Sequence, residues 1–381
     1  MARTALVLGA GIGGIVLAET LRKLLPAEDR VLVVERERTH VFGPSLLWHM
    51  TGDNEAAAFT RPLSALSARG IDLVTGEITR IDPAIRSVDV GGKTLTGDAM
   101  IVALGADYAP EAVPGLAEAG HNLYTLEGAQ RIRAALDAFE GGRIVVLTAA
   151  PAYKCPAAPY EAAMLVASYC RKRHLQKETT VSVHAAEAAP MMVTGPVVGG
   201  QVVQMLQMKG IDYFPAHQVT KVEAGRLHFA DGATADFDLL LYVPPHRAPT
   251  VVKAAGLCAE SGWIAVDRET METRFPGVHA IGDVTSIPLK MGRPLPKAGV
   301  FAHGQAGVVA RNIARAWTGK GAAARFDGHG MCFLEIGGGM AGVGSGNFYA
   351  EPTPDVRMRN PNPLWHLGKV LYEKYWLWRR F

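Results

Sequence analysis

Short runs of apolar residues alternate along the chain with stretches whose apolar positions recur at helical spacing. The runs ALVL at 5–8, VLVV at 31–34 and IVVL at 144–147 are continuous. Such runs are typical of strands in a parallel sheet that helices cover on both faces. The pattern therefore predicts an α/β fold. Because 381 residues exceed one ordinary core, we expect at least two domains.

The first strand leads directly into a glycine-rich turn and a helix. The segment TALVLGAGIGGIVLAETLRKL carries the pattern Gly9-x-Gly11-x-x-Gly14. These glycines allow a tight turn, close backbone approach to a pyrophosphate, and close packing of helix on strand. The free N–H groups at the helix start bind phosphates. A second strand ends at Glu35, placed to accept hydrogen bonds from ribose hydroxyls. We therefore predict a dinucleotide site; a glycine-rich turn without a ligand is the alternative.

Two later segments favour FAD as this dinucleotide. GVHAIGDVTSIP at 277–288 is an apolar strand ending in Gly-Asp, and a second helix, PKAGVFAHGQAGVVARNIARA, follows it. It resembles the second FAD motif of flavoproteins with two dinucleotide-binding domains, whose aspartate (here Asp283) binds the ribityl chain. AMIVALGAD at 99–107 resembles the segment by which such chains leave the FAD domain. The predicted cofactor site comprises Gly9, Gly11, Gly14, Glu35, Ile78, Gly105, Asp283 and Lys297.

The segment RIVVLTAAPAYKCPAAPYEAAMLVASYCRK repeats the strand–turn–helix outline without glycine. No glycine occurs between Arg143 and Thr194. Side chains at this turn hinder a pyrophosphate, and Pro156 and Pro159 remove two N–H donors from the helix entrance. We therefore predict a second Rossmann-like domain in which nicotinamide nucleotide binding is disfavoured.

Cys155 lies in this glycine-free turn. A helix N-terminus lowers the pKa of a thiol and Lys154 adds positive charge, so we expect a reactive thiolate here. A buried, inert cysteine is the alternative. We expect Cys170, in an apolar helical run, and Cys258, in a loop before a strand, to be structural.

Several segments together resemble a known family. YKCPAAPYE, IGDV, PLPKAGVFAHGQA and HGMCFLEIG resemble segments of the sulfide:quinone oxidoreductases and of the flavoprotein subunit of flavocytochrome c sulfide dehydrogenases. In that family two cysteines face each other over the flavin as a redox disulfide or polysulfide bridge. The resemblance assigns this role to Cys155 and Cys332. Typical sulfide:quinone oxidoreductases have a third, upstream cysteine that is missing here, so the pattern is closer to the flavocytochrome c subunit.

The resemblance implies a reaction. Hydrosulfide attacks the disulfide and leaves a persulfide on one cysteine and a thiolate on the other; this thiolate then delivers two electrons to FAD by adding to the flavin and departing. Glu161 is the candidate proton acceptor, and Lys297 is the candidate to offset negative charge on reduced flavin. A helix-capping Glu161 and a solvated Lys297 are the alternatives. Phe333, Phe348 and Tyr349 are candidates to line a quinone slot.

The composition changes near the C-terminus. The prolines of AEPTPDVRMRNPNP predict a linker, and PLWHLGKVLYEKYWLWRRF after it predicts a helix. Basic residues that flank an aromatic and leucine-rich face are typical of helices at a lipid interface; packing on its own domain or on a dimer partner is the alternative. We expect a chain without residues 357–381 to keep flavin reduction. The apolar face comprises Leu364, Leu367, Leu371, Tyr375 and Trp378, and the cations expected to meet headgroups are Arg357, Arg359, Lys369, Lys374, Arg379 and Arg380.

The net charge, the start of the sequence and the cysteine spacing limit the partners, location and metal that we expect. A net charge of +3, with no basic stripe in the body of the chain, argues against nucleic acid as a partner. The start of the sequence lacks the pattern of a signal peptide, which favours a peripheral membrane protein at the cytoplasmic face. No CxxC pair suggests zinc.

We therefore expect two Rossmann-like domains plus an amphipathic, membrane-associating C-terminal segment. The predicted function is FAD-dependent oxidation of sulfide, or a related small sulfur nucleophile, with electrons passed to membrane quinone, in a chain that could form a homo-oligomer. A cytochrome acceptor, a type II NADH:quinone dehydrogenase and a non-catalytic flavin-binding protein remain alternatives. The predicted divisions are 1–110 and 271–325 for the FAD domain, 111–270 for the second domain, 326–356 for the redox-cysteine and quinone side, and 357–381 for the tail.

Overall fold

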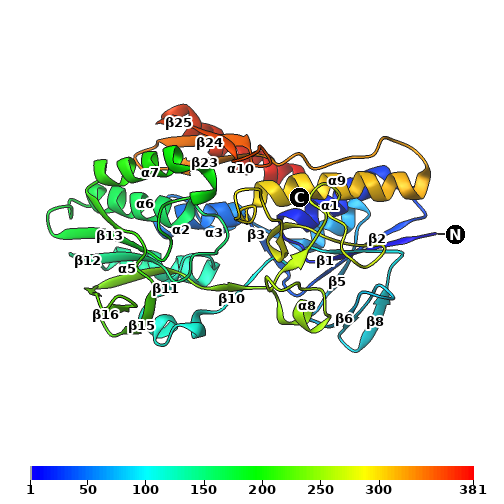
Figure 1. The fold of residues 1–381 in the computed structure, drawn as a ribbon, viewed down its shortest axis with the longest axis horizontal. Coiled ribbons are helices and arrows are strands. Elements are labelled where there is room, and N and C mark those ends of the chain that lie inside the picture. The colour runs from blue at the N-terminus through cyan, green and yellow to red at the C-terminus, as the bar shows by residue number, and fades with distance from the viewer. Residues whose placement is uncertain (1) are drawn as a thin grey trace.

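Two parallel sheets organise the molecule, one in each half (Figure 1). The computed structural model describes residues 2–381. One sheet has the strand order β21-β9-β1-β2-β5 and the other β11-β18-β12-β13-β14, and the strands pair in parallel throughout both. The predicted α/β fold with two Rossmann-like sheets is confirmed.

The first sheet is built from distant parts of the chain, since its edge strand β21 comes from beyond residue 277. Its central strand β1 is buried along nearly its whole length, as expected for a strand covered on both faces. Helices α1 and α9 pack together on one face, and a small antiparallel sheet covers the other. The elements are β1 (Thr4–Leu8), α1 (Ile12–Leu24), β2 (Arg30–Glu35), β5 (Asp72–Thr75), β6 (Ile78–Asp82), β7 (Ser87–Val90), β8 (Lys93–Thr96), β9 (Ala99–Val102), β21 (Val278–Ala280) and α9 (Gly299–Thr318).

The second sheet repeats this arrangement with β12 at its centre. Helix α6 follows β12 and packs on it and on β13. The elements of this half are β11 (His121–Asn122), α5 (Leu126–Asp137), β12 (Gly142–Thr148), α6 (Ala158–Lys172), β13 (Thr179–Ala185), α7 (Pro196–Met208), β14 (Ile211–Phe214), β15 (Val219–Glu223), β16 (Arg226–Phe229), β17 (Thr234–Asp236) and β18 (Leu239–Val243).

Shorter elements connect these layers. They are β3 (Thr39–Val41), α2 (Leu46–Met50), α3 (Ala56–Phe59), β4 (Thr60–Pro62), β10 (Asp107–Tyr108), α4 (Leu116–Ala119), β19 (His246–Arg247), α8 (Thr250–Ala254), β20 (Ile264–Ala265) and β22 (Thr285–Ser286).

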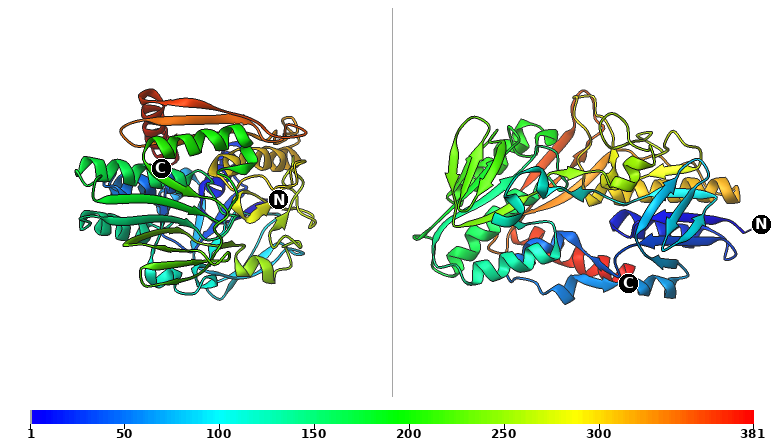
Figure 2. Two further views of the ribbon diagram at one scale, coloured as in Figure 1. Left: turned by 60° about the vertical axis from the view of Figure 1, so that its left-hand side comes forward. Right: turned by 90° about the horizontal axis from the view of Figure 1, so that it is seen from below.

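The C-terminal part forms an antiparallel sheet and a helix that bridge the two halves. The sheet consists of β23 (His329–Glu335), β24 (Ala341–Asn347) and β25 (Asp355–Asn362), and helix α10 (Pro363–Arg380) follows it. Figure 2 shows α10, in red, running between the two halves. The predicted tail helix is confirmed. Within residues 2–381, no helix combines the length and apolar character that crossing a membrane requires.

The prediction of a proline-rich linker before this helix is wrong. Most of that stretch is strand β25, which pairs with β24. The strand tolerates Pro361 because β25 is an edge strand and its register shifts there, so the missing N–H breaks no regular ladder.

Candidate active site

One large cavity touches both halves and the C-terminal segment. Its volume is about 1120 Å³. Its lining includes the glycine-rich turn, Cys155 from the second half, Cys332 from β23 and Lys369 from α10. Residues far apart in the sequence therefore surround one space.

The turn between β1 and α1 has the geometry that its glycines predict. Gly9 has a φ of +100°, in the region that favours glycine. A Cβ on Gly14 would lie 1.9 Å from the carbonyl oxygen of Gly9, so only glycine allows the helix to approach the turn. A Cβ on Gly11 would instead meet open space at the cavity. The backbone of Gly11 thus faces the place where a pyrophosphate would lie.

Glu35 stands at the end of β2, beside this turn. Its Oε2 accepts a hydrogen bond from the N–H of Ala10 at 2.7 Å, and its Oε1 accepts one from the N–H of Glu37 at 3.1 Å. Glu35, Ile78 and Gly105 all line the cavity. The carboxylate is thus held by backbone and faces the cavity close to the N-terminus of α1.

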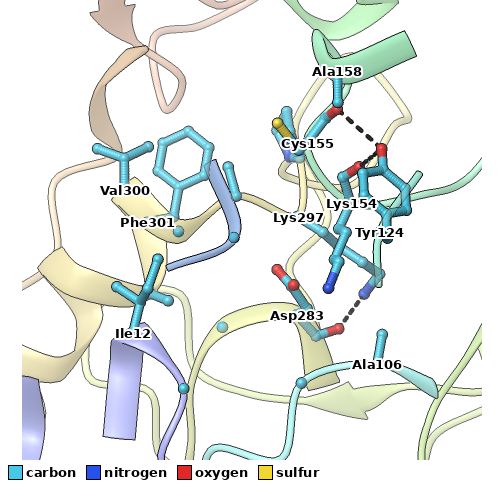
Figure 3. A pocket seen from close by; sticks show the side chains of 18 of the residues that line it. Ile12, Ala106, Tyr124, Lys154, Cys155, Ala158, Asp283, Lys297, Val300 and Phe301 are labelled. Carbon is cyan, nitrogen blue, oxygen red and sulfur yellow. Dashed lines mark hydrogen bonds between the residues drawn. The ribbon is translucent and has the colours of Figure 1, made fainter. Parts of the chain in front are cut away.

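Asp283 and Lys297 also line the cavity and lie near each other, as Figure 3 shows. The Lys297 amine donates to the carbonyl oxygens of Asp283, at 2.6 Å, and Thr285, at 2.8 Å. It also lies 3.4 Å from the ring centroid of Trp263. Burial lowers the pKa of Lys297 to about 8, and Asp283 partly opposes that shift. Lys297 is therefore not a freely solvated residue.

Cys155 lies in the loop between β12 and α6, in a left-handed backbone conformation with φ of +49°. Its N–H donates to the carbonyl of Lys297 at 2.7 Å, and its carbonyl accepts from the N–H of Ala158 at 2.9 Å. A cysteine keeps such a conformation only where surrounding contacts fix it, and strain of this kind is concentrated at functional sites.

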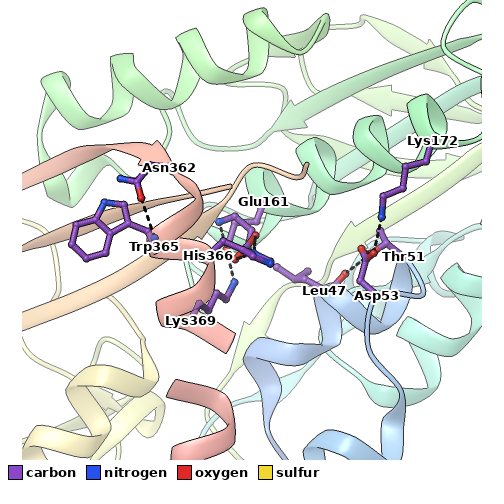
Figure 4. Close-up of polar contacts among 10 residues, drawn as sticks. Leu47, Thr51, Asp53, Glu161, Lys172, Asn362, Trp365, His366 and Lys369 are labelled. Carbon is purple, nitrogen blue, oxygen red and sulfur yellow. Dashed lines mark hydrogen bonds and ion pairs between the residues drawn. The ribbon is translucent and has the colours of Figure 1, made fainter. Parts of the chain in front are cut away.

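Cys332 reaches the same cavity from β23, and both thiols are free. Glu161 joins the elements that carry them. Its Oε1 accepts hydrogen bonds from the N–H of Glu335, at 2.8 Å, and from the amine of Lys369, at 3.0 Å (Figure 4). Glu161 is 3% exposed. Its carboxylate binds β23 and α10, so the alternative in which it caps its own helix is wrong.

Both thiols are exposed at the cavity, so the expectation of a thiolate activated by Lys154 and a helix N-terminus stays a prediction. Dense surrounding groups, which reduce hydration, raise the pKa of Cys155 to about 12 and that of Cys332 to about 11, and Glu161 adds to both increases while Lys369 opposes them. Lys154 interacts with Cys155 as well, but its amine lies 4.9 Å from the ring centroid of Tyr108 and 5.5 Å from that of Tyr124.

Side chains fill the glycine-free turn. The buried carboxylate of Glu187 accepts hydrogen bonds from the hydroxyls of Tyr153, Tyr160, at 2.6 Å, and Thr148, at 2.7 Å. Both turns line the cavity, the first with open backbone at Gly11 and the second with Tyr153, Cys155 and Glu187. This packing agrees with the prediction that a nicotinamide nucleotide is disfavoured here.

Two of the three residues predicted to line a quinone slot line the cavity, and the third does not. Phe333 and Phe348 line the cavity, and the ring of Phe348 packs edge-on against Phe301 at 4.9 Å. Tyr349 does not line it: its hydroxyl donates to the carbonyl of Arg268 at 2.6 Å, and its ring packs on Phe326. The assignment of Tyr349 to a quinone slot stays a prediction, and Tyr349 does not share the cavity with Phe333 and Phe348.

Helix α10 presents different residues to the interior and to the outside. The five predicted apolar residues are all exposed, from 51% for Leu367 to 75% for Leu364. Lys369 and Arg380, expected at lipid headgroups, instead bind Glu161 and Glu19 inside the protein. The prediction for these two cations is wrong.

The inner side of α10 belongs to the site. Lys369, Tyr372 and Glu373 line the cavity, which sequence reasoning missed. Lys369 and Glu373 are four positions apart, and this polar spacing opposite an apolar stripe was the available signal. Trp376 is 2% exposed and stacks on His40, whose Nδ1 lies 3.2 Å from the carbonyl of Ala10 in the glycine-rich turn. The expectation that a chain lacking 357–381 keeps flavin reduction is therefore not supported.

A glycine-rich dinucleotide turn, a second Rossmann-like domain and two cysteines at one cavity define an oxidoreductase with two dinucleotide-type domains. The chain belongs to the pyridine nucleotide-disulphide oxidoreductase family, whose model matches residues 3–306. The predicted superfamily and its FAD cofactor are confirmed. The matched region contains Cys155 but ends before Cys332 and α10.

Among curated proteins, the chain is similar to the mitochondrial sulfide:quinone oxidoreductase of Mus musculus, with 23% identity over 91% of this chain and 78% of the relative. It is also similar to the sulfide-quinone reductase of Aquifex aeolicus, with 24% identity over 100% of this chain and 91% of the relative. The solved structure of the Aquifex aeolicus sulfide:quinone oxidoreductase has a TM-score of 0.89 at 21% identity, covering 100% of this chain and 91% of that one. The fold therefore extends over the whole chain, including the part beyond the family model.

Proposed function

We propose that this chain oxidises sulfide, or another small sulfur nucleophile, through Cys155 and Cys332, and passes the electrons by way of FAD to a quinone. The observation that carries this proposal is the single cavity that contains the dinucleotide turn and both cysteines. The relatives named for sulfide and quinone support the choice of substrate and acceptor.

The cavity fits FAD. The open backbone at Gly11 and the N-terminus of α1 would hold the pyrophosphate, and Glu35 would hold the ribose. Asp283 and Lys297 lie farther along the cavity, toward Cys155. FAD bound in this way would accept two electrons from the cysteine pair and pass them to the acceptor.

The cysteines carry the sulfur chemistry. When they form a disulfide, hydrosulfide attacks one sulfur; the bond between the cysteines breaks and a new sulfur–sulfur bond forms on the attacked cysteine. The electron pair of the broken bond stays on the other cysteine as a thiolate. When this thiolate and the persulfide join in a polysulfide bridge, a new sulfur–sulfur bond forms and two electrons and a proton are released, and these electrons would pass to FAD. Glu161 is the carboxylate close to both sulfurs, and we assign it the proton that the substrate releases.

The acceptor requires contact with a membrane surface, and the outer face of α10 suits this role. Leucine and aromatic side chains are exposed there, with Arg357, Arg359 and Lys374 exposed on β25 and α10. A cation at an anionic surface contributes about 1 kcal/mol and is screened by salt, whereas the apolar face is not. Binding to anionic vesicles would therefore weaken, but persist, at high salt.

The test is anaerobic addition of sulfide, and then of NADH, to the purified yellow protein. Sulfide should bleach the flavin absorbance and NADH should not, because the turn between β12 and α6 lacks glycine and its Tyr153 and Tyr160 pack on Glu187. A short-chain quinone should then restore the absorbance. Bleaching by NADH alone would assign the chain to NADH:quinone chemistry, and reoxidation by a cytochrome but not by quinone would change the acceptor.

A further inference from the structure

A buried ion pair lies where α6, β23 and α10 meet. The amine of Lys369 is 3.0 Å from Oε1 of Glu161, and the two side chains are 10% and 4% exposed. The same Oε1 accepts the N–H of Glu335, three residues after Cys332. Glu161 itself is in the first turn of the helix that follows Cys155. The pair therefore connects the backbone segments of both cysteines.

Lys369 is held from a second direction. Its amine lies 4.8 Å from the ring centroid of Trp48, on α2. A buried ion pair is weak evidence for stability, because desolvation cancels much of the attraction. A charge fixed in this way beside a cavity is better explained by what it does to the groups in that cavity.

The charges around the thiols act in opposite directions. Glu161 raises the pKa of Cys155 and of Cys332, and Lys369 lowers both. Cys332 also raises the pKa of Cys155. Burial raises the pKa of Tyr124, near Cys155, and of Tyr372, near Cys332, so both tyrosines stay neutral. Lys369 lines the same cavity as both cysteines and is the cation whose charge acts on both thiols, although it comes from the last helix of the chain.

We propose that Lys369 stabilises negative charge on the Cys155–Cys332 pair and that Glu161 holds it in position. The consequence for catalysis rests on the proposed function: the cysteine that leaves when hydrosulfide breaks the disulfide departs as a thiolate, and a cation beside it favours that step. Lys154, adjacent to Cys155 in the sequence, lies over the rings of Tyr108 and Tyr124 and interacts with Cys155, whereas Lys369 acts on both cysteines.

The test measures how fast iodoacetamide alkylates the two reduced thiols in the FAD-bound protein. A Cys170→Ser/Cys258→Ser background leaves only Cys155 and Cys332 to be counted by mass spectrometry. At a pH below the thiol pKa, the alkylation rate follows the thiolate fraction and changes tenfold for each pKa unit. Lys369→Met should slow alkylation roughly tenfold, Glu161→Gln should speed it, and Lys369→Arg should restore most of the rate. Lys154→Met removes the other cation that interacts with Cys155 and should slow alkylation less than Lys369→Met does.

Opposite signs for Lys369→Met and Glu161→Gln separate an electrostatic role from a structural one, since damage to the fold would not speed one variant and slow the other. If Lys369→Met alone does not fold around the unpaired Glu161, the comparison is made in a Glu161→Gln background, where adding Lys369→Met should again slow alkylation. An unchanged rate in that pair, or a larger loss in Lys154→Met, overturns the proposal. Alkylation needs neither sulfide nor quinone, so a protein that behaves as expected here but is not bleached by sulfide would refute the proposed function only.

Discussion

The turn between β1 and α1 and the turn between β12 and α6 occupy equivalent places. Each follows the central strand of a five-stranded parallel sheet and leads into a helix, at the edge where α/β folds bind ligands. In the first turn, glycines leave the backbone open to the cavity. In the second, Tyr153 and Tyr160 close on Glu187, and Cys155 faces the cavity.

This difference shows that the same position in the fold can bind a ligand through its backbone or present a reactive side chain. Backbone N–H groups bind an anion only if no Cβ intervenes, which requires glycine. A reactive side chain needs a rigid turn that aims it, which the φ of Cys155 and its bond to Lys297 provide. The two turns thus supply the cofactor site and the redox group of one cavity.

The largest effect should come from removing the reactive group of the second turn. Cys155→Ser or Cys332→Ser should slow flavin reduction by sulfide by roughly a thousandfold or more, because the sulfur–sulfur exchange has no partner. FAD should stay bound, since neither thiol belongs to the turn that holds it. Stopped-flow absorbance checks the rate, with Cys170→Ser as a nearly silent control. Full activity in Cys155→Ser would show that the second turn has no redox role.

Sequence reasoning succeeded where chemistry is local in the chain. The three glycines predicted a turn whose geometry the structure has, and the missing glycines predicted a closed second turn. It failed where the result depends on the direction in which a side chain points, or on a contact between residues far apart in the sequence. Lys154 comes directly before the left-handed turn at Cys155, and its amine lies over two tyrosine rings. The carboxylate of Glu161 pairs with a cation 208 positions away in the sequence. The prolines before α10 predicted a linker, but Pro361 lies in β25, an edge strand whose shifted register tolerates it.

Substitutions at Gly11 and Gly14 should distinguish an effect on folding from an effect on FAD binding. Gly14→Ala places a Cβ against the carbonyl of Gly9, so we expect a loss of about 3 kcal/mol or more in the free energy of unfolding, together with loss of FAD. Gly11→Val projects only into the cavity and should keep the fold while losing FAD. Thermal unfolding of the apoproteins and flavin absorbance distinguish the two. Stoichiometric FAD in Gly11→Val would mean that no pyrophosphate lies against this backbone.

The packing of the second turn can be tested through Glu187. Glu187→Leu leaves three hydroxyl donors without their acceptor, at roughly 1 kcal/mol or more each if they stay dry. We therefore expect about 3 kcal/mol of destabilisation, measured by urea unfolding of the FAD-bound protein, and a smaller loss in Glu187→Gln, which keeps an acceptor oxygen. A neutral Glu187→Leu would show that the turn is not held closed by this carboxylate.

The smallest effect should come from giving the second turn back its missing donors. Pro156→Gly combined with Pro159→Ala restores two N–H groups at the entrance of α6, and the greater freedom of the unfolded chain should cost only about 1 kcal/mol of stability. If the prolines alone excluded a nicotinamide nucleotide, this variant should gain bleaching by NADH. We expect no gain, because Tyr153 and Tyr160 still close on Glu187 in the place that the nucleotide would need. Anaerobic titration with NADH reads this directly, and sulfide added afterwards shows whether the flavin can still be reduced. Bleaching by NADH would mean that the two turns differ in their backbone donors alone and not in their packing.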